Sequence, residues 1–287
     1  MITIQHLHFN YKSSSSEVFH DFSLNIADGK IVGLLGRNGT GKSTLLYLLT
    51  GLLRSTQGSI LVDDFNPQDR QPEMLQNIML VPEEIDLPAV KFKEFIKVNR
   101  VFYPNFSDEV LHQVLNDFQL PADIHLGALS MGQKKKVFMA FALATNTKYL
   151  LMDEPTNGLD IPSKAQFRRT IAAQMNENRT ILMSTHQVHD VEQLIDHVVM
   201  IDGQSLMLDT SMSQLSQKVR FEQRPYGTPI DDALYAEPSL TGTAVIVPAQ
   251  GKEETPISLE LLFNALVQNP ALRHHLEDNE ANNTGFH

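Results

Sequence analysis

The chain has 287 residues, of which 42% are hydrophobic, and a formal net charge of −11. This length suits one large domain or a domain with an appendage, and the acidic charge disfavours a nucleic-acid-binding surface, so no nucleic acid is expected as a partner. The chain has no cysteine, which excludes disulfides and thiolate metal sites. The opening residues lack a secretory-signal pattern, and the longest apolar run, residues 137–144, is shorter than the roughly 18 residues that cross a bilayer. We therefore expect a soluble chain that another protein holds at any membrane.

The N-terminal part predicts strands arranged around one helix. Residues 2–9 and 18–26 alternate in part between apolar and polar, with a serine-rich turn between them, and they predict an antiparallel pair. The apolar run 31–35 predicts a buried strand, and residues 43–53 have helical spacing. Further short strands are expected at 58–62 and 77–81.

A phosphate-binding loop joins that buried strand to the helix. Residues 36–44, GRNGTGKST, match G-x-x-x-x-G-K-[ST] at every fixed position. Glycines let the backbone N–H groups turn inward to phosphate oxygens, Lys42 adds a charge, Ser43 offers a hydroxyl to Mg²⁺, and the helix start adds its dipole. An ordinary glycine-rich turn is the alternative. The motif predicts a nucleoside triphosphate site, with nucleotide contacts from Gly36, Asn38, Gly39, Gly41, Lys42, Ser43 and Thr44.

The remaining chain alternates between helical and strand-like segments. Residues 92–148 are helical in pattern and predict an insertion, and strands return at 149–153, 180–184 and 198–201 with helices between them, which favours a mainly parallel sheet. Beyond about residue 210 prolines punctuate shorter segments, with a strand expected at 243–247, a helix at 259–268 and a loose polar end from Glu277. The sequence thus predicts an α/β domain over 1–208, with a helical subdomain at about 83–148, and a small α/β accessory extension over 209–287.

Two carboxylates follow the buried strand 149–153. In an open α/β sheet ligands bind at the carboxyl ends of the strands, where Asp153 would hold Mg²⁺ and Glu154 would accept a proton from an attacking water. A solvated acidic turn is the alternative, which the upstream phosphate loop disfavours.

Residues 129–133, LSMGQ, resemble the L-S-G-G-Q signature of ATP-binding cassette (ABC) proteins. Other segments follow in the order of that family: residues 157–160 resemble its D-loop, and His186 resembles its switch histidine. Tyr11 lies where the family has an aromatic residue stacked on adenine, and Glu83 occupies the Q-loop position. The resemblance covers residues 1 to about 208. It implies a P-loop NTPase core with an N-terminal antiparallel β subdomain and a helical insertion.

The resemblance also implies roles for these residues. The signature serine and its neighbours would lie at a helix start and face the nucleotide of a second copy, so that two chains enclose two ATP molecules head to tail, and ATP would shift the balance toward the closed pair. Catalysis would fall to Lys42, Glu154 and His186, and Mg²⁺ would be held by Ser43, Asp153 and Glu83. The remaining nucleotide contacts would be Tyr11, whose ring offers a π-face to adenine, together with Ser130, Gly132, Gln133 and Asp160.

Two positions depart from the family pattern. Met131 replaces a glycine of the signature and requires a negative φ, and Glu83 replaces the more common glutamine but keeps an oxygen that can ligate Mg²⁺. Three lysines, residues 134–136, follow the signature; they either attract phosphates or form a solvated basic face. Residues His189, His274 and His275 are expected to be surface histidines.

The resemblance implies the ATPase subunit of an ABC transporter, with ATP and Mg²⁺ as cofactors. Glu83 and the C-terminal extension favour an exporter over an importer. The expected partners are a second copy or a paralogous ATPase subunit and a separate integral membrane permease, which would hold the chain at the cytoplasmic face of the cell membrane. Three alternatives remain: an ABC ATPase of translation or DNA repair, an unrelated phosphate-loop enzyme such as a GTPase or kinase, and a cassette that binds ATP without cleaving it.

Overall fold

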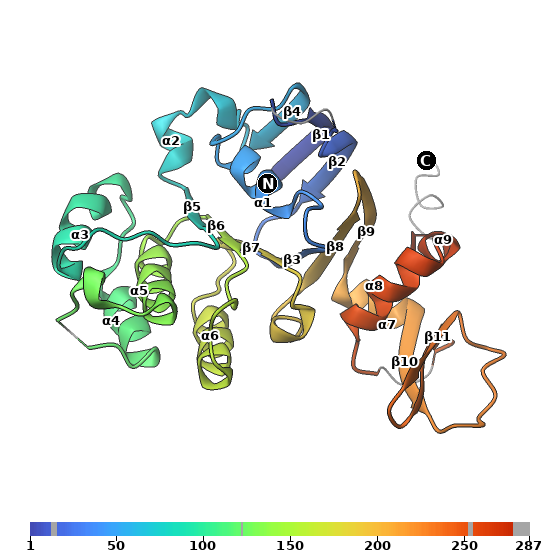
Figure 1. Ribbon diagram of the computed structural model, residues 1–287. Coiled ribbons are helices and arrows are strands. Elements are labelled where there is room, and N and C mark those ends of the chain that lie inside the picture. Colours follow the sequence, from blue (N-terminus) through green and yellow to red (C-terminus); the bar gives the residue numbers. More distant parts are fainter. Residues whose placement is uncertain (13–15, 122, 252–254, 278–287) are drawn as a thin grey trace.

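A six-stranded sheet forms the centre of the molecule (Figure 1). The computed structural model describes residues 1–12, 16–121, 123–251 and 255–277. Neighbouring strands pair in parallel from one edge of the sheet as far as β8, and β9 is antiparallel to β8, which confirms the predicted mainly parallel α/β fold. In spatial order the strands are β5 (Ile78–Val81), β6 (Tyr149–Asp153), β7 (Thr180–Thr185), β3 (Ile31–Gly36), β8 (His197–Asp202) and β9 (Ser205–Ser211).

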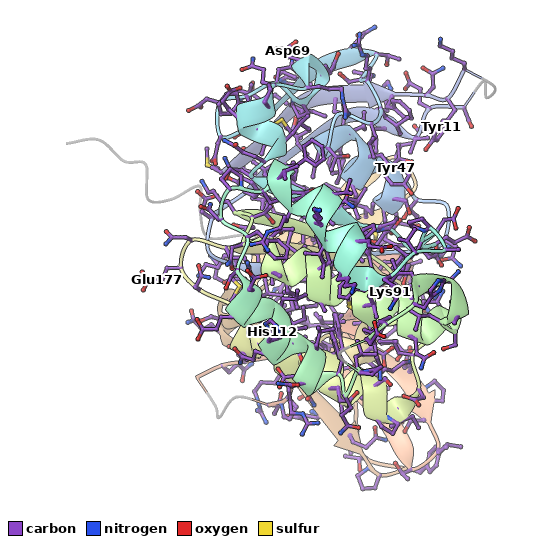
Figure 2. The ribbon with its side chains drawn as sticks, turned by 90° about the vertical axis from the view of Figure 1, so that its left-hand side faces the viewer. Tyr11, Tyr47, Asp69, Lys91, His112 and Glu177 are labelled. Carbon is purple, nitrogen blue, oxygen red and sulfur yellow. The ribbon has the colours of Figure 1, made fainter. Side chains whose placement is uncertain are left out.

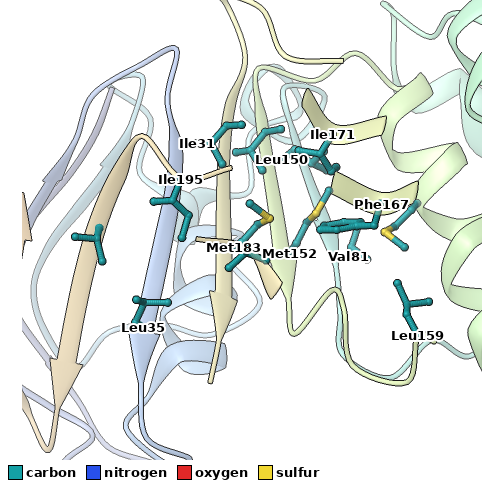
Figure 3. Packing of buried hydrophobic residues seen from close by; sticks show 14 of the residues in the cluster. Ile31, Leu35, Val81, Leu150, Met152, Leu159, Phe167, Ile171, Met183 and Ile195 are labelled. Atoms are coloured by element: carbon teal, nitrogen blue, oxygen red, sulfur yellow. The ribbon is translucent and has the colours of Figure 1, made fainter. Parts of the chain in front are cut away.

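Strands β3, β6 and β7 are buried along their whole length, as near-continuous apolar strands of a parallel sheet should be. Successive side chains alternate between two hydrophobic cores, so Leu34 belongs to one core and Leu35 to the other. Figure 3 shows the core that contains Leu35. Met183 lies in the same core, where Phe167 packs beside Met152. The carboxyl ends of the strands are thereby fixed in a rigid frame.

An antiparallel sheet of β2 (Phe19–Ile26), β1 (Ile2–Phe9) and β4 (Gln57–Val62) covers one face. The predicted pairing of the first two segments is confirmed, and β4 adds to the free side of β1, a partner that the sequence did not reveal. Helix α1 (Lys42–Leu49) packs in the same core. It ends before the predicted residue 53, because Gly51 turns the chain with φ +68° and lies so close to Pro67 that a Cβ would collide with that carbonyl.

The helical insertion lies at one end of the sheet, away from the C-terminal elements (Figure 1). Among the described residues of 92–148, the regular elements are helices joined by turns, as predicted. The segment from residue 67 onward contains η1 (Pro67–Asp69), α2 (Pro72–Leu75), α3 (Phe92–Asn99), η2 (Arg100–Phe102), α4 (Asp108–Asp117), η3 (Leu126–Ala128) and α5 (Met131–Ala144).

The connections between the later strands differ from one another. Helix α6 (Ile161–Ala173) joins β6 to β7 as expected. The helix expected between β7 and β8 was wrong: the described chain there forms only the short η4 (Val188–Asp190) and further turns. These turns already bury Val191 and Ile195 against the sheet, so a longer helix is not needed to cover it.

The C-terminal part is a second, three-stranded antiparallel sheet with helices. Its strands run in the order β10 (Val219–Arg224), β12 (Gly242–Pro248) and β11 (Tyr235–Ser239), and its helices are α7 (Met212–Lys218), α8 (Leu259–Gln268) and α9 (Ala271–Glu277). The predictions of β12 and α8 are confirmed, whereas the other four elements were not predicted. The loose polar end was expected from Glu277, which closes α9, and the rest of it falls outside the described residues. Within the described part of the chain, no helix is long and apolar enough to span a membrane.

Candidate functional site

The phosphate loop runs between the end of β3 at Gly36 and the start of α1 at Lys42. Gly41 caps the helix with φ +97°, and a Cβ there would lie 2.6 Å from Val18 Cγ1. Both the backbone conformation and the close approach of the N-terminal sheet therefore require glycine. The loop is thus held against residues from a different sheet.

Lys42 is buried beneath this loop. Its ammonium donates to the carbonyl oxygens of Gly36 at 2.9 Å and Arg37 at 3.0 Å. Burial lowers the pKa of Lys42, while the nearby carboxylates, Glu154 foremost, act in the opposite direction. The positive charge is therefore placed at the centre of the loop, on the side where β6 ends at Asp153 and Glu154 follows.

A cavity of about 370 Å³ opens over the loop and brings together residues from five separate segments. The β1–β2 connection, the phosphate loop and the ends of β5, β6 and β7 all contribute. Most of the residues predicted to bind the nucleotide in this chain are found here. The lining residues are Tyr11, Val18, Asn38, Gly39, Gly41, Lys42, Ser43, Thr44, Glu83, Glu154 and His186.

The Glu154 carboxylate is almost fully enclosed at the end of β6. Oε2 accepts a hydrogen bond from Thr185 Oγ1 at 3.0 Å, and Oε1 lies 2.7 Å from His186 Nδ1. Lys42 Nζ lies 3.9 Å from Oε1. The neighbouring carboxylate of Asp153 is buried and accepts a hydrogen bond from Ser184 Oγ. Both acidic side chains are therefore held by groups from the end of β7.

The backbone of Glu154 is in the left-handed region, with φ +44°. Such a conformation costs a non-glycine residue about 1–3 kcal/mol and persists only where the surroundings impose it. Here the Glu154 N–H donates to the Ser184 carbonyl at 3.0 Å, and the Glu154 carbonyl accepts from Lys135. The turn therefore fixes where the carboxylate points.

Lys135 is a site residue that the sequence did not reveal. Neither alternative for the lysine run describes it, because its side chain is buried and donates to the carbonyl oxygens of Glu154 at 2.9 Å and Asn157 at 3.0 Å. It thereby ties helix α5 to the turn that follows β6. The signal was its place in α5: it lies one turn before the buried Met139 and so falls on the inward face of the helix.

Two further contacts complete the rim of the cavity. Asn157 Nδ2 donates to Glu83 Oε1 at 2.9 Å, which joins the Q-loop position to the D-loop position. The Tyr11 hydroxyl lies 2.8 Å from Thr44 Oγ1, and its ring meets Phe9 edge-on at 5.0 Å between centroids. Tyr11 is thus placed over the start of α1.

The predicted signature residues lie elsewhere. Ser130 is the N-cap of α5, and it forms a capping box with Gln133. Gly132 lies beside Gly158, since a Cβ on it would lie 3.4 Å from the Gly158 carbonyl oxygen. None of the residues 130–133 is among the described residues that line the cavity, and Asp160 caps α6 through a 2.9 Å bond from the Ser163 N–H. Met131 takes an ordinary helical φ and is 73% exposed.

A second cavity, of about 540 Å³, adjoins the phosphate loop on its other side. Gly36, Arg37 and Asn38 line one wall, residues 186–190 another, and Glu260, Phe263 and Asn264 of α8 the third. The sequence did not indicate that the C-terminal extension reaches the segment after His186.

The comparisons with known proteins agree with this arrangement. A family model described as "ABC transporter" matches residues 19–157. The chain is 32% identical over 228 residues to "ABC transporter ATP-binding protein NatA" of Bacillus subtilis (strain 168), covering 76% of this chain and 92% of NatA. It is 31% identical over 229 residues to "SkfA peptide export ATP-binding protein SkfE" of the same organism, covering 78% and 94%. A solved dimer of the ATP-binding cassette MJ0796 in a post-hydrolysis state, bound to ADP and Pi, aligns with a TM-score of 0.64 and 22% identity over 74% of this chain and 99% of that one.

Proposed function

The chain belongs to the ABC transporter family as an ATP-binding subunit with ATPase activity, and from that premise we propose that it dimerises on ATP and drives a separate membrane permease in the direction of export. One observation carries the proposal. The cavity over the phosphate loop gathers Lys42 from the start of α1, Glu154 from the end of β6 and His186 from the end of β7.

In the proposed reaction Glu154 accepts the proton of the attacking water, and Lys42 compensates charge on the β- and γ-phosphates. Phosphoryl transfer needs little covalent help beyond a positioned nucleophile and neutralised charge, so fixed side chains suffice. His186 orients the water and donates to the γ-phosphate. The ring of Tyr11 stacks on adenine, and the loop N–H groups from Gly36 to Thr44 bind the phosphates.

The donor set also fits Mg²⁺. The Ser43 hydroxyl and the carboxylates of Asp153 and Glu83 are oxygen ligands, the type that Mg²⁺ prefers, and two of these residues line the cavity. Ser184 Oγ contacts Oδ1 of Asp153, and within the described residues Asp153 forms no ion pair, so Oδ2 can bind a metal. When bound, Mg²⁺ would neutralise charge on the phosphates.

Dimerisation is supported by where the signature residues lie. Ser130, Gly132 and Gln133 stand at the start of α5, outside the described lining of their own cavity, with Met131 exposed beside them. A helix start presents free N–H groups and a favourable dipole to an anion. A second copy placed head to tail would bring this helix start to the phosphates across the interface. The MJ0796 cassette, which shares the fold, is dimeric.

The permease is proposed to dock in an apolar groove between the helical insertion and the core. Its volume is about 1000 Å³, and aromatic and aliphatic side chains of α2, β5, α3, η2 and α5 line it together with Tyr47. Figure 2 faces this side of the molecule and places Tyr47 between Tyr11 and Lys91. Val101 and Phe102 on its wall are 72% and 64% exposed. Such a patch suits a short amphipathic helix from a membrane protein.

We further propose that transport is in the direction of export and that the permease holds the chain at the cytoplasmic face of the membrane. SkfE, which matches this chain over most of its length, is named for peptide export. Glu83 in place of glutamine and the C-terminal extension favour the same direction.

The dimer is tested with Glu154→Gln, which keeps the cavity but removes the proposed base. With Mg²⁺ and ATP, light scattering should report a doubled mass for this variant. A matched variant that adds Lys42→Ala should stay monomeric, because it loses the phosphate contact. A monomeric Glu154→Gln protein at saturating ATP would contradict the dimer while leaving the ATPase assignment intact.

The permease contact is tested with Val101→Asp and Phe102→Asp together. These changes should abolish co-purification of a multi-spanning membrane protein from native membranes, and the isolated chain should keep its ATPase rate. Leu240→Asp, at a fully exposed site in the turn between β11 and β12, is the control and should not affect co-purification.

A further inference from the structure

A group of metal-ligating side chains lies outside the nucleotide site, on the N-terminal sheet. His8 at the end of β1, His20 at the start of β2 and Glu17 just before β2 bring one ligand atom each within 4.8 Å of one another. His20 Nδ1 lies 2.6 Å from Glu17 Oε2, and His8 Nδ1 lies 3.7 Å from the other oxygen, Oε1. The two imidazole rings meet edge-on, with centroids 4.9 Å apart.

The backbone around these residues is fixed by bonds that do not use the ligand atoms. The His8 carbonyl accepts from both Thr56 N–H, at 2.9 Å, and Thr56 Oγ1, at 2.7 Å. The Glu17 carbonyl accepts from Gln204 Nε2 at 2.8 Å. The Val18 N–H donates to the Phe9 carbonyl at 2.7 Å and closes the strand pair between the two histidines. The pairing of β1 with β2 therefore holds the three side chains close together.

From this geometry we propose that His8, Glu17 and His20 bind a divalent transition-metal ion of the zinc class. Two imidazoles and one carboxylate are a known ligand set for zinc, which binds them at about 2.0–2.2 Å and leaves a fourth position to water. Tetrahedral ligands at that distance lie about 3.3 Å apart. The distance between His20 Nδ1 and Glu17 Oε2 must widen by about 0.7 Å, and the other ligand separations must close. Partly exposed side chains achieve this by rotation.

A charge cluster without metal is the competing explanation. One imidazole suffices to pair with Glu17, as His6 does with Asp21 on the same sheet at 2.7 Å. The second imidazole, directed at the other oxygen of the same carboxylate, is what distinguishes a metal site from such a pair. Because the ligands come from both β1 and β2, the ion would tie the strands together where the chain turns toward Tyr11.

The test is zinc competition against a chromophoric chelator, using the full chain without Mg²⁺ or nucleotide. The wild type should hold one zinc equivalent more than His20→Gln, and Glu17→Gln should bind this ion at least about tenfold more weakly. Zinc that binds elsewhere on the chain binds equally to the wild type and the variants, so it does not contribute to the difference in stoichiometry between them. His6→Gln is the matched control and should bind like the wild type.

A second readout separates binding from misfolding. Zinc should raise the thermal midpoint of the wild type and of His6→Gln but not that of His20→Gln, and all three should unfold alike in a chelator. Equal zinc stoichiometry and affinity in the wild type and His20→Gln would overturn the proposal. An equal loss of affinity in His6→Gln and His20→Gln would also overturn it, because the binding would then belong to the sheet face in general.

Discussion

Nδ1 of His186 lies 2.7 Å from Oε1 of Glu154. An ionised carboxylate only accepts hydrogen bonds, so Nδ1 donates in this contact. A second proton, on Nε2, would let the ring also donate to a phosphate in the cavity. The His186 N–H reaches Oε1 of Glu154 at 3.1 Å. Two adjacent strands, β6 and β7, therefore hold Glu154 and His186 in fixed positions relative to each other.

Glu154→Gln should lower the rate of ATP hydrolysis by about 10²–10⁴-fold, the usual contribution of a general base. Binding of ATP should be preserved, because the amide keeps the shape and the contact with Thr185. Single-turnover hydrolysis and equilibrium binding of a fluorescent ATP analogue separate the two effects. Turnover at the native rate would exclude Glu154 as the base.

Lys135→Met should slow hydrolysis and lower stability. The substitution keeps the length of the side chain but leaves the buried carbonyls of Glu154 and Asn157 without their donor, at a cost of about 1–3 kcal/mol in the free energy of unfolding. We expect kcat to fall while KM for ATP changes little, because Lys135 positions the turn and does not line the cavity. Lys134→Met, one residue earlier in α5, is the control and should change neither quantity.

Ser130→Ala should cost about 1 kcal/mol of stability, since it removes the cap of α5. Ser258 caps α8 in the same way, so Ser258→Ala should cost a similar amount in urea unfolding. Under the dimer proposal, only Ser130→Ala should also reduce ATP turnover and the ATP-dependent doubling of mass. Equal turnover in the two variants would confine Ser130 to a structural role.

Tyr11→Ala should weaken ATP binding by about 1–3 kcal/mol, the usual value for an aromatic side chain stacked on a base. Tyr11→Phe keeps the ring and loses only the contact with Thr44 Oγ1, so its affinity should stay close to that of the wild type. Titration calorimetry with ATP distinguishes the two variants. If both lose affinity equally, the hydroxyl rather than the ring face is responsible.

Asp28→Asn should flatten the acid dependence of stability. Burial raises the pKa of Asp28, but hydrogen bonds from the Met1 amino group, Lys148 and Tyr149 outweigh it and lower the pKa to about 2. A depressed carboxyl pKa stabilises the fold above the unfolded value, near 3.8, and this contribution is lost as the pH falls toward 2. Because the side chain is 38% exposed, solvent screening limits the effect to about 1 kcal/mol.

Urea unfolding checks this prediction. The wild type should exceed Asp28→Asn in free energy of unfolding at pH 7, and the difference should narrow below pH 4. Asp86→Asn, an exposed position, is the control and should show a small difference at both pH values.

Local sequence patterns named most of the residues that line the cavity over the phosphate loop. Lys42, Glu154 and His186 each follow a buried apolar strand, and the parallel sheet necessarily brings such strand ends together. The pairing of β4 with β1 and the contact of Lys135 with the turn after β6 depend on residues far apart in sequence. Neither leaves a local pattern, so neither was predicted.

The C-terminal sheet was missed for a similar reason. Strands β10 and β11 are interrupted by charge and proline, and they become strands only because β12 pairs with both. Their register is therefore set by a partner and not by their own alternation. A helix between β7 and β8 was wrongly inferred from the usual alternation of strands and helices. That short connection does not follow the alternation.

The central sheet ends on one side at β5, a strand of four residues that Pro82 follows at once. A proline has no N–H to offer, and so short a strand gives a foreign β-segment little to pair with. Concentrated native protein should therefore resist strand-by-strand aggregation from this edge. Any fibril that forms on heating should begin from chains in which β5 has already left the sheet.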